Sequence, residues 1–221
     1  MKNRSVNSMN RKELKDRAKI ALGANYWASV IAGAVISLFT IAITFKGKPG
    51  MSWEEMREAV ATGGSIGFFV QMFLINPLSV GVNRFFIKNA NGEREDDGAL
   101  LKCLLYPFTH GYINVVIKMF LMNLFIGLWT ILFIVPGIIK AFEYMMIPYI
   151  LAENPKAEYH MLMGTTKSMM KGYKFEAFIL GLSLIGWWFL AAITFGLVGV
   201  FYVYPYTEYT FAHFYLKLKN K

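Results

Sequence analysis

Long apolar runs separated by short polar stretches make up most of this chain. The first run, residues 26–45, holds 20 residues without a charge. As a helix it rises about 30 Å, which matches the hydrocarbon thickness of a bilayer. The alternative is a cleaved signal peptide, but the polar leader of 25 residues is long and no convincing cleavage site follows Phe45. The run therefore predicts a membrane-spanning helix.

The second apolar run, residues 66–87, is interrupted by polar side chains and by a proline. The interruptions are Gln71, Asn76, Pro77, Ser79 and Asn83. Polar groups at membrane depth need partners on other helices, because lipid tails offer none. This run therefore predicts a kinked helix that is buried among the others.

The last two apolar stretches are each about twice the length of a single span. Residues 112–151 contain Pro136-Gly137 where a tight reversal is needed, and residues 177–215 contain Phe195-Gly196 at their midpoint. Each stretch therefore predicts a hairpin of two helices. The expected fold is all-α and polytopic, with six transmembrane helices in three hairpins, and residues 1–221 form a single membrane domain.

The spacing of tryptophan, glycine and proline suggests an internal repeat. Trp129 precedes Gly137 by eight residues, as Trp188 precedes Gly196. A Pro-Tyr step follows each pair, at 148–149 and at 205–206, and an amphipathic stretch that ends in glycine and an aromatic residue precedes each hairpin. We predict three units, residues 1–90, 91–152 and 153–221, each an interfacial helix followed by a hairpin. Chance recurrence of these residue types in membrane helices is the alternative.

Composition supports a membrane protein and narrows its chemistry. The chain is 56% hydrophobic and 17% charged, with 16% aromatic residues and a mean hydropathy of +0.41. Disordered and ordinary cytosolic proteins are excluded by these values. Cys103 is the only cysteine, so an internal disulfide and a cysteine-based metal site are excluded as well.

The distribution of charge predicts the orientation. With both termini cytoplasmic, the inner segments carry 18 Lys and Arg, and the outer loop 46–65 carries three. The inner segments also carry nine acidic residues, so they account for the whole net charge of +9. The positive charge is therefore explained by membrane orientation, and we expect no nucleic-acid partner.

A basic amphipathic stretch opens the third unit. Its apolar positions recur at helical spacing, and four lysines lie on or beside the opposite face. The apolar positions are Tyr159, Leu162, Met163, Thr166, Met169 and Met170, and the lysines are Lys156, Lys167, Lys171 and Lys174. We expect a helix that begins near Asn154-Pro155 and binds anionic lipid of the inner leaflet through these lysines. A solvated cytoplasmic loop is the alternative.

Several segments together resemble a bacterial family. They are Asn76-Pro77, LWTILFIVPGIIKA at 128–141, PYILAENP at 148–155, SMMKG at 168–172 and Gly186-Trp187-Trp188. Nearly end to end, the chain is similar to the integral membrane proteins of domain of unknown function 975, an uncharacterised protein family. The resemblance implies a multi-pass protein of a bacterial plasma membrane, and it supplies no activity, substrate, cofactor or catalytic residue.

Charged groups within the predicted spans are the first candidates for function, because each is costly in lipid unless it is paired or reaches the interface. Lys118 and Glu208 fall at matching depths of about 9 to 14 Å from the inner face. We predict an ion pair between them, which could serve a gated carrier or a proton relay. Snorkelling of Lys118 to the interface is the alternative.

Lys140 and Glu143 form the second charged set. They are three residues apart near the predicted outer end of the fourth helix, which favours an ion pair on one helix face. Lys140 is also expected to snorkel outward. Glu143 is expected to line a cavity or to meet Asn76, Gln71 or Asn123 of neighbouring helices.

No motif of a soluble enzyme is present. His110, His160 and His213 map to the inner boundary, but their spacing does not fit a metal site, and we expect the acidic run 93–97 to be a solvated turn. The aromatic residues around Trp187-Trp188 and 201–206 indicate lipid or helix packing, with a groove for an amphiphilic ligand as the alternative.

Two classes of function remain. We expect a non-enzymatic membrane module, without cofactor or metal, that binds lipids or partner membrane proteins. The alternative is a small transporter or flippase-like carrier, which the repeats, the proline-containing returning helices and the intramembrane polar residues favour. Repeats of one orientation mildly favour the first class, because many carriers have inverted repeats.

Overall fold

The computed structural model describes residues 10–44, 52, 54, 67–93 and 98–221, and for 39–44 the backbone alone. This part of the chain is helical and contains no strand. Its helices are α1 (Arg11–Ala24), α2 (Tyr26–Thr44), α4 (Asn76–Ala90), α5 (Ala99–Thr109), α6 (Tyr112–Leu132), α7 (Ile134–Tyr144), α8 (Ile147–Glu153), α9 (Tyr159–Met170), α10 (Lys174–Leu182), α11 (Ile185–Ile193) and α12 (Tyr204–Lys219). Two π-helical turns, η1 (Gln71–Ile75) and η2 (Gly199–Val203), lead into α4 and α12.

Four described helices are long and apolar enough to cross a membrane. They are Gly67–Ala90, Tyr112–Leu132, Ile134–Glu153 and Lys174–Ile193. A fifth results if α1 and the start of α2, which meet at 98°, count as one broken span. The six predicted spans are therefore not confirmed. The last of them corresponds to η2 and α12, and α12 carries Glu208, Lys217 and Lys219.

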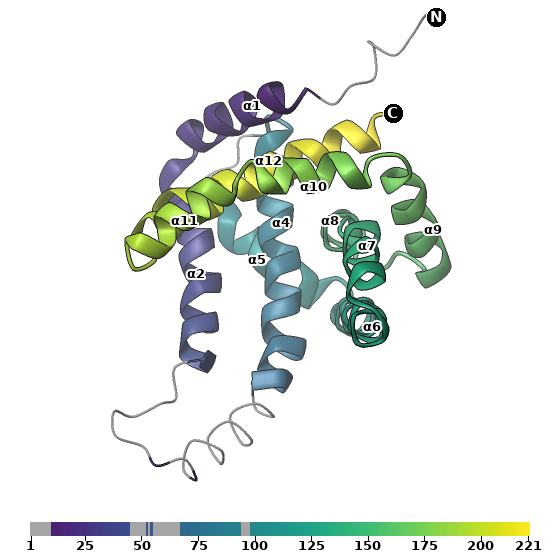
Figure 1. Cartoon of the computed structure of the whole chain (residues 1–221). Helices are drawn as coiled ribbons and strands as arrows, with labels where there is room; N and C mark the ends of the chain where they lie inside the picture. Colours follow the sequence, from purple (N-terminus) through teal and green to yellow (C-terminus); the bar gives the residue numbers. More distant parts are fainter. Residues whose placement is uncertain (1–9, 45–51, 53, 55–66, 94–97) are drawn as a thin grey trace, which may run out of the picture.

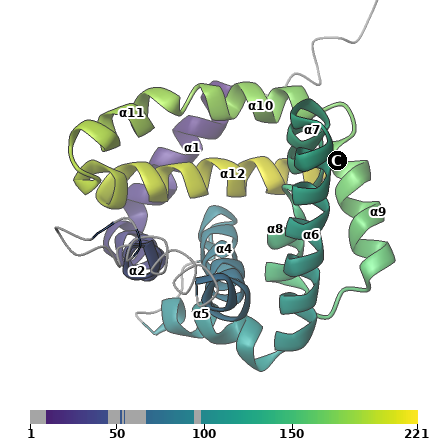
Figure 2. The same cartoon turned by 60° about the horizontal axis from the view of Figure 1, so that its bottom comes forward.

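The helices run in several directions around a shared centre. In Figure 1, α2 and α4 run side by side, and α10, α11 and α12 lie across them. Figure 2 shows α6 along the side of the molecule, between α8 and α9. At the centre α4 packs against both α8 and α12, and the ring of Phe86 in α4 meets that of Tyr209 in α12 edge to face at 4.7 Å. These central helices position the polar groups described below.

Each central helix begins with a proline. Pro77, Pro148 and Pro205 occupy the first or second position of α4, α8 and α12. Each proline follows a break in the regular α-helical hydrogen-bond pattern, which accommodates its missing N–H. The break is a π-helical turn before α4 and α12 and the turn at residues 145–146 before α8. The prolines therefore mark the points at which the returning helices restart.

The two predicted reversals have different outcomes. The turn at Phe195-Gly196 is present, and both residues have positive φ, 49° and 84°. The reversal predicted at Pro136-Gly137 is wrong, because the break falls at Phe133, which has extended backbone (φ −154°, ψ 124°). Pro136 instead lies in the first turn of α7, where its φ is suitable.

Gly137 has a packing role in this hairpin. A Cβ atom at Gly137 would lie 2.6 Å from the Cα atom of Thr130. Only a residue without a side chain allows α6 and α7 to approach this closely.

Helices α1, α5 and α9 correspond to the three predicted interfacial stretches. The start predicted at Asn154-Pro155 is wrong, since Asn154 caps the end of α8 and α9 begins at Tyr159. The predicted apolar face of α9 is confirmed, because Leu162, Met163, Thr166 and Met170 are buried.

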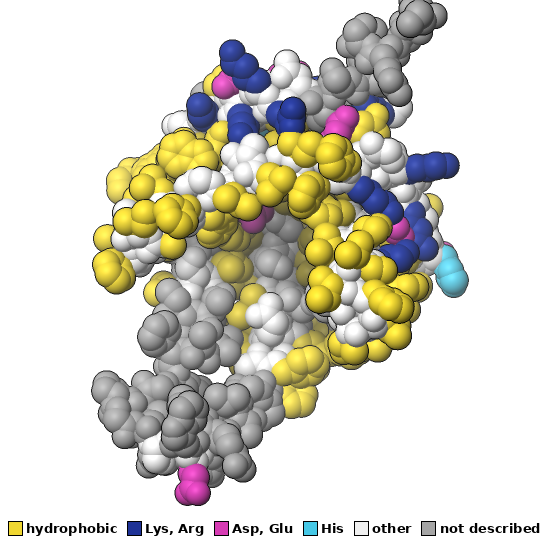
Figure 3. Space-filling view, viewed as in Figure 1, with side chains coloured by type: hydrophobic (Ala, Val, Ile, Leu, Met, Phe, Trp, Pro, Cys, Tyr) yellow, Lys and Arg dark blue, Asp and Glu magenta, His cyan; other side chains and the backbone are white. Residues whose placement is uncertain are grey.

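The surface separates charge from apolar side chains. In Figure 3, Lys and Arg gather over α1, over the nearby C-terminal part of the chain and over α9. Hydrophobic side chains cover α6, α7, α10 and α11. Figure 3 thus shows a basic side and an apolar body, the arrangement expected of a protein held in a membrane by its apolar helices.

Candidate functional site

The structure separates the polar residues predicted within the membrane into distinct places. The predicted ion pair of Lys118 and Glu208 is wrong. Lys118 is buried, and its Nζ donates to the carbonyl of Ala157 in the turn after α8. Glu208 instead lies beside Tyr149, and its Oε2 atom is buried without a hydrogen-bond partner. Equal depth fixes only one coordinate of a side chain, and these two point to different neighbours.

The predicted ion pair of Lys140 and Glu143 is confirmed, with Nζ 2.9 Å from Oε1. The second oxygen of Glu143 accepts from Lys174. Its backbone carbonyl accepts from Thr166 Oγ1 at 3.2 Å. Glu143 therefore ties α7 to α9 and α10.

The contact with Lys174 corrects two predictions. Glu143 was expected near the outer face and Lys174 on the inner face, and side chains at opposite faces cannot meet. Glu143 is the tenth residue of α7 and therefore lies about 14 Å along the helix from its start. At this point α7 has run back from the reversal toward the side of the molecule on which α10 begins. Lys174 is consequently half-buried in an ion pair. Lys140 is paired as well, so its side chain does not simply snorkel.

The amide side chains predicted as partners of Glu143 meet one another instead. Gln71 Nε2 donates to Asn76 Oδ1 at 3.1 Å. With Asn123 of α6 they line a pocket of about 270 Å³. The remaining walls are apolar, among them Phe68, Phe120 and other side chains of the two helices. The pocket combines an apolar interior with three amides, a combination typical of sites for small or amphiphilic ligands.

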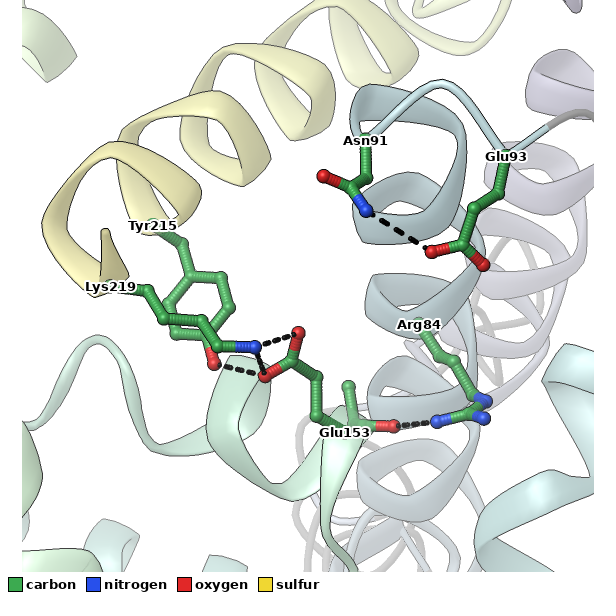
Figure 4. A network of polar contacts seen from close by, with 7 residues as sticks. Arg84, Asn91, Glu93, Glu153, Tyr215 and Lys219 are labelled. Atoms are coloured by element: carbon green, nitrogen blue, oxygen red, sulfur yellow. Dashed lines mark hydrogen bonds and ion pairs between the residues drawn. The ribbon is translucent and has the colours of Figure 1, made fainter.

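A polar network that sequence reasoning missed joins the central helices (Figure 4). Arg84 of α4 donates to the carbonyl of Ala152 at the end of α8, at 2.7 Å. The neighbouring Glu153 accepts from the hydroxyl of Tyr215 at 2.7 Å and from Lys219, both in α12. The guanidinium of Arg84 also lies 3.6 Å from the centre of the Tyr106 ring. The segment PYILAENP contains Ala152 and Glu153, so the motif itself was the available signal.

A second set of ion pairs connects α1 to α12. Glu13 accepts from Lys217 at 3.3 Å and from Arg17 at 2.9 Å. The hydrogen bond and charge of Lys217, with the charge of Arg17, lower the pKa of the Glu13 carboxyl. The basic end of α12 is therefore fastened to the first amphipathic helix.

The lysines predicted to bind lipid divide into two groups. Lys156, Lys167 and Lys171 are exposed, and within the described residues their ammonium groups have neither an ion pair nor a hydrogen bond. Lys174 is instead paired with Glu143. Beside the three exposed lysines, α9 presents Met161 to the surroundings. This part of the chain offers both positive charge and apolar surface.

Metal ligands do not gather in the part of the chain that the structure describes. Among those residues no group of three or more His, Cys, Asp or Glu could hold a metal ion. His213 is buried in α12, His110 caps α5, and His160 is exposed on α9. Most of the acidic run, residues 94–97, lies outside the described residues.

Comparison with known proteins gives one match. The model of a family described as "Protein of unknown function (DUF975)" matches residues 131–221. This region extends from the end of α6 through α12 and contains most of the segments on which the resemblance was based, whereas the resemblance was predicted nearly end to end. No curated protein and no solved structure matches the chain.

Proposed function

We propose that this chain, residues 131–221 of which belong to the DUF975 family, is a non-enzymatic membrane module that binds anionic lipid. We place it in a bacterial plasma membrane with both termini cytoplasmic and three hairpins that arise from an internal repeat. The prolines that begin α4, α8 and α12 support the repeat. Partner membrane proteins are a further class of ligand for the same surface.

The proposal of lipid binding rests on three exposed lysines, Lys156, Lys167 and Lys171. Elsewhere on the basic side, lysines such as Lys217 and Lys219 are engaged by carboxylates. The three exposed lysines have no such partner within the described residues. Lys167 lies in α9, Lys156 precedes this helix and Lys171 follows it, and one face of α9 is anchored in the core. A basic helix held flat by its apolar face is suited to an anionic membrane surface, where each lysine contributes about 1 kcal/mol.

Native mass spectrometry can test this proposal. The protein is reconstituted in nanodiscs of phosphatidylglycerol and phosphatidylcholine with matched acyl chains, and the retained lipids are counted after release. The triple variant Lys156→Gln, Lys167→Gln, Lys171→Gln is expected to retain phosphatidylglycerol about 100-fold less tightly, from three contributions of about 1 kcal/mol.

The matched control for this experiment replaces the same three lysines with arginine. Because the charge is unchanged, this variant should retain phosphatidylglycerol like the wild type. Equal retention by the glutamine variant would contradict lipid binding by α9.

A carrier is the second candidate function, and the amide-lined pocket favours it. Gln71, Asn76 and Asn123 place polar groups between two helices long enough to span a membrane. Carriers bind substrates at such intramembrane sites. The pocket supports a small or amphiphilic substrate.

Lipid scrambling in proteoliposomes tests the carrier. Dithionite bleaches fluorescently labelled phospholipid in the outer leaflet alone. A carrier that moves labelled lipid from the inner to the outer leaflet therefore allows well over half of the label to be bleached. The variants Gln71→Leu and Asn123→Leu should slow this loss while the protein still folds. Bleaching of only half of the label by the wild type would contradict a flippase-like role.

A further inference from the structure

A second pocket, of about 340 Å³, lies where α1, α4 and α12 meet. Its walls come from three parts of the chain. Among the lining residues are Arg17, Ile20, Asn25, Asn89, Glu93 and His213. The predicted intramembrane sites and the three exposed lysines around α9 lie elsewhere, and of the ion pairs described above the pocket shares only Arg17.

His213 provides the buried polar group of the pocket. The residue is 8% exposed, and its ring faces the backbone of Arg17. Its Nε2 atom is buried and has no hydrogen-bond partner. A buried nitrogen without a partner is costly, and here it borders a space large enough for a ligand group. If the other ring nitrogen donates to the Arg17 carbonyl, Nε2 is an acceptor in the neutral ring.

Opposite charges lie at the rim of the same pocket. The Arg17 side chain is 62% exposed and retains donors beyond its bond to Glu13. The Glu93 carboxylate is 51% exposed; one oxygen accepts from Asn91 at 3.2 Å, and the other lies 3.9 Å from Lys88 Nζ. Between them Asn25 Nδ2 donates to Asn89 Oδ1 at 3.2 Å, which fixes both amides. The rim therefore offers a cationic donor and an anionic acceptor.

The pocket also has an apolar border that suits a lipid. Ile20, which lines the pocket, is 74% exposed, and Ala21 and Ala24 of the same helix line it as well. Aromatic and aliphatic side chains beside basic residues are typical of the headgroup boundary. A ligand in this pocket can place its charged end among the polar groups and its apolar end along α1.

We propose that this pocket binds the headgroup of a phospholipid whose terminal group carries hydrogen-bond donors. The phosphate binds Arg17, and the terminal ammonium or hydroxyl group donates to His213 Nε2 and Glu93. Phosphatidylethanolamine and phosphatidylglycerol both have such donors, whereas the trimethylated nitrogen of phosphatidylcholine has none. The inference rests on the proposed lipid-binding function, but it assigns a separate site and predicts selectivity by hydrogen bonding.

Native mass spectrometry of the full chain in detergent tests the assignment. The protein is titrated with phosphatidylethanolamine, phosphatidylglycerol and phosphatidylcholine of identical acyl chains. The wild type should bind the first two about tenfold more tightly than the third, as expected for a lost hydrogen bond to a buried acceptor. Equal binding of all three lipids would overturn the proposal.

Four variants at three positions separate the roles of the lining residues. Glu93→Gln, which removes the charge at the rim, should reduce the preference over phosphatidylcholine. His213→Leu should remove the contribution of the buried acceptor, and His213→Gln, which keeps an acceptor, should retain part of it. Arg17→Gln should weaken binding of all three lipids. An unchanged preference in Glu93→Gln and His213→Gln together with unchanged affinity in Arg17→Gln would overturn the proposal, even if His213→Leu failed to fold.

Two further arms identify the source of the ligand and separate the two lipid sites. A hundredfold excess of free phosphoethanolamine should leave the lipid bound, and its displacement would overturn the assignment to a lipid. The α9 glutamine variant should keep the preference for phosphatidylethanolamine, since its lysines are not in this pocket. If the α9 glutamine variant lost its preference for phosphatidylethanolamine, the assignment of this pocket would be overturned. If the same variant retained phosphatidylglycerol like the wild type, the lipid-binding function proposed for the lysines around α9 would be contradicted instead.

Discussion

The helices that contain α4 and α6 are both long and apolar, yet they occupy opposite environments. Within Gly67–Ala90, 61% of the most apolar window is buried, against 22% within Tyr112–Leu132. The buried helix carries Asn76, Asn83 and Arg84, while α6 exposes mostly aliphatic and aromatic side chains. Polar and small residues in an apolar run thus mark a helix that packs against protein, because lipid gives them no partners.

The largest effect on stability is expected from adding a methyl group to α4 at Gly81. A Cβ atom at Gly81 would lie 2.6 Å from the carbonyl oxygen of Leu104 and 2.8 Å from its Cα atom. Backbone atoms cannot move aside as a side chain can, so Gly81→Ala should separate α4 from α5 and lower the free energy of unfolding by about 3 kcal/mol. Unfolding by titration with SDS in mixed micelles measures this change in free energy.

The matched control is Gly181→Ala in α10, where nothing lies within 4 Å of the added atom. Alanine in a helix is favoured over glycine by about 0.5–1 kcal/mol, so this variant should be slightly stabilised. Equal destabilisation of both variants would break the contrast between central and outer helices.

The next largest effect is expected from Arg84→Met. The variant loses the bond to Ala152 and the contact with the Tyr106 ring, and it should lower the free energy of unfolding by about 2–3 kcal/mol. Arg84→Lys should restore only part, because an ammonium lacks the planar face of guanidinium. Lys102→Met, at an exposed position of α5, should change it by less than about 0.5 kcal/mol.

Glu143→Gln tests the outer helices, where polar contacts are fewer. Two lysines that share one carboxylate would be left facing each other. Because both are partly exposed, we expect a loss of only about 1–2 kcal/mol. Adding Lys174→Gln should recover part of it, and a double variant worse than the single one would contradict the shared carboxylate.

The smallest effect is expected between Lys118 and Glu208. Their partners differ, so the double variant Lys118→Met, Glu208→Gln should equal the sum of the single variants within about 0.5 kcal/mol. A double-mutant cycle of unfolding free energies measures this coupling. A coupling above about 1 kcal/mol would restore the ion pair that the sequence suggested.

Local signals predicted local structure well. The turn at Phe195-Gly196, the buried face of α9 and the i,i+3 pair of Lys140 and Glu143 each depend on residues within a few positions. The break at Phe133 was missed because proline is tolerated in the first turn of a helix, so Pro136 could not locate the reversal.

Long-range placement could not be derived in the same way. Periodicity shows which face of a helix is buried, but it does not show which helix covers it. Lys174 meets Glu143 across 31 positions, and Arg84 meets Ala152 across 68. Depth alone suggested Lys118 and Glu208 as partners, and their directions around the helix axes decided otherwise.

The pairing of α1 with α12 has a consequence for biogenesis. Glu13 and Lys217 are 204 positions apart. At 5–20 residues per second, a ribosome needs roughly 10 to 40 s to make the intervening chain. During that time the apolar side of α1, with Leu14, Ala18 and Leu22, has no α12 to cover it. An amphipathic helix can spend this interval lying on the membrane surface, so the lipid would act as a temporary partner until α12 is made.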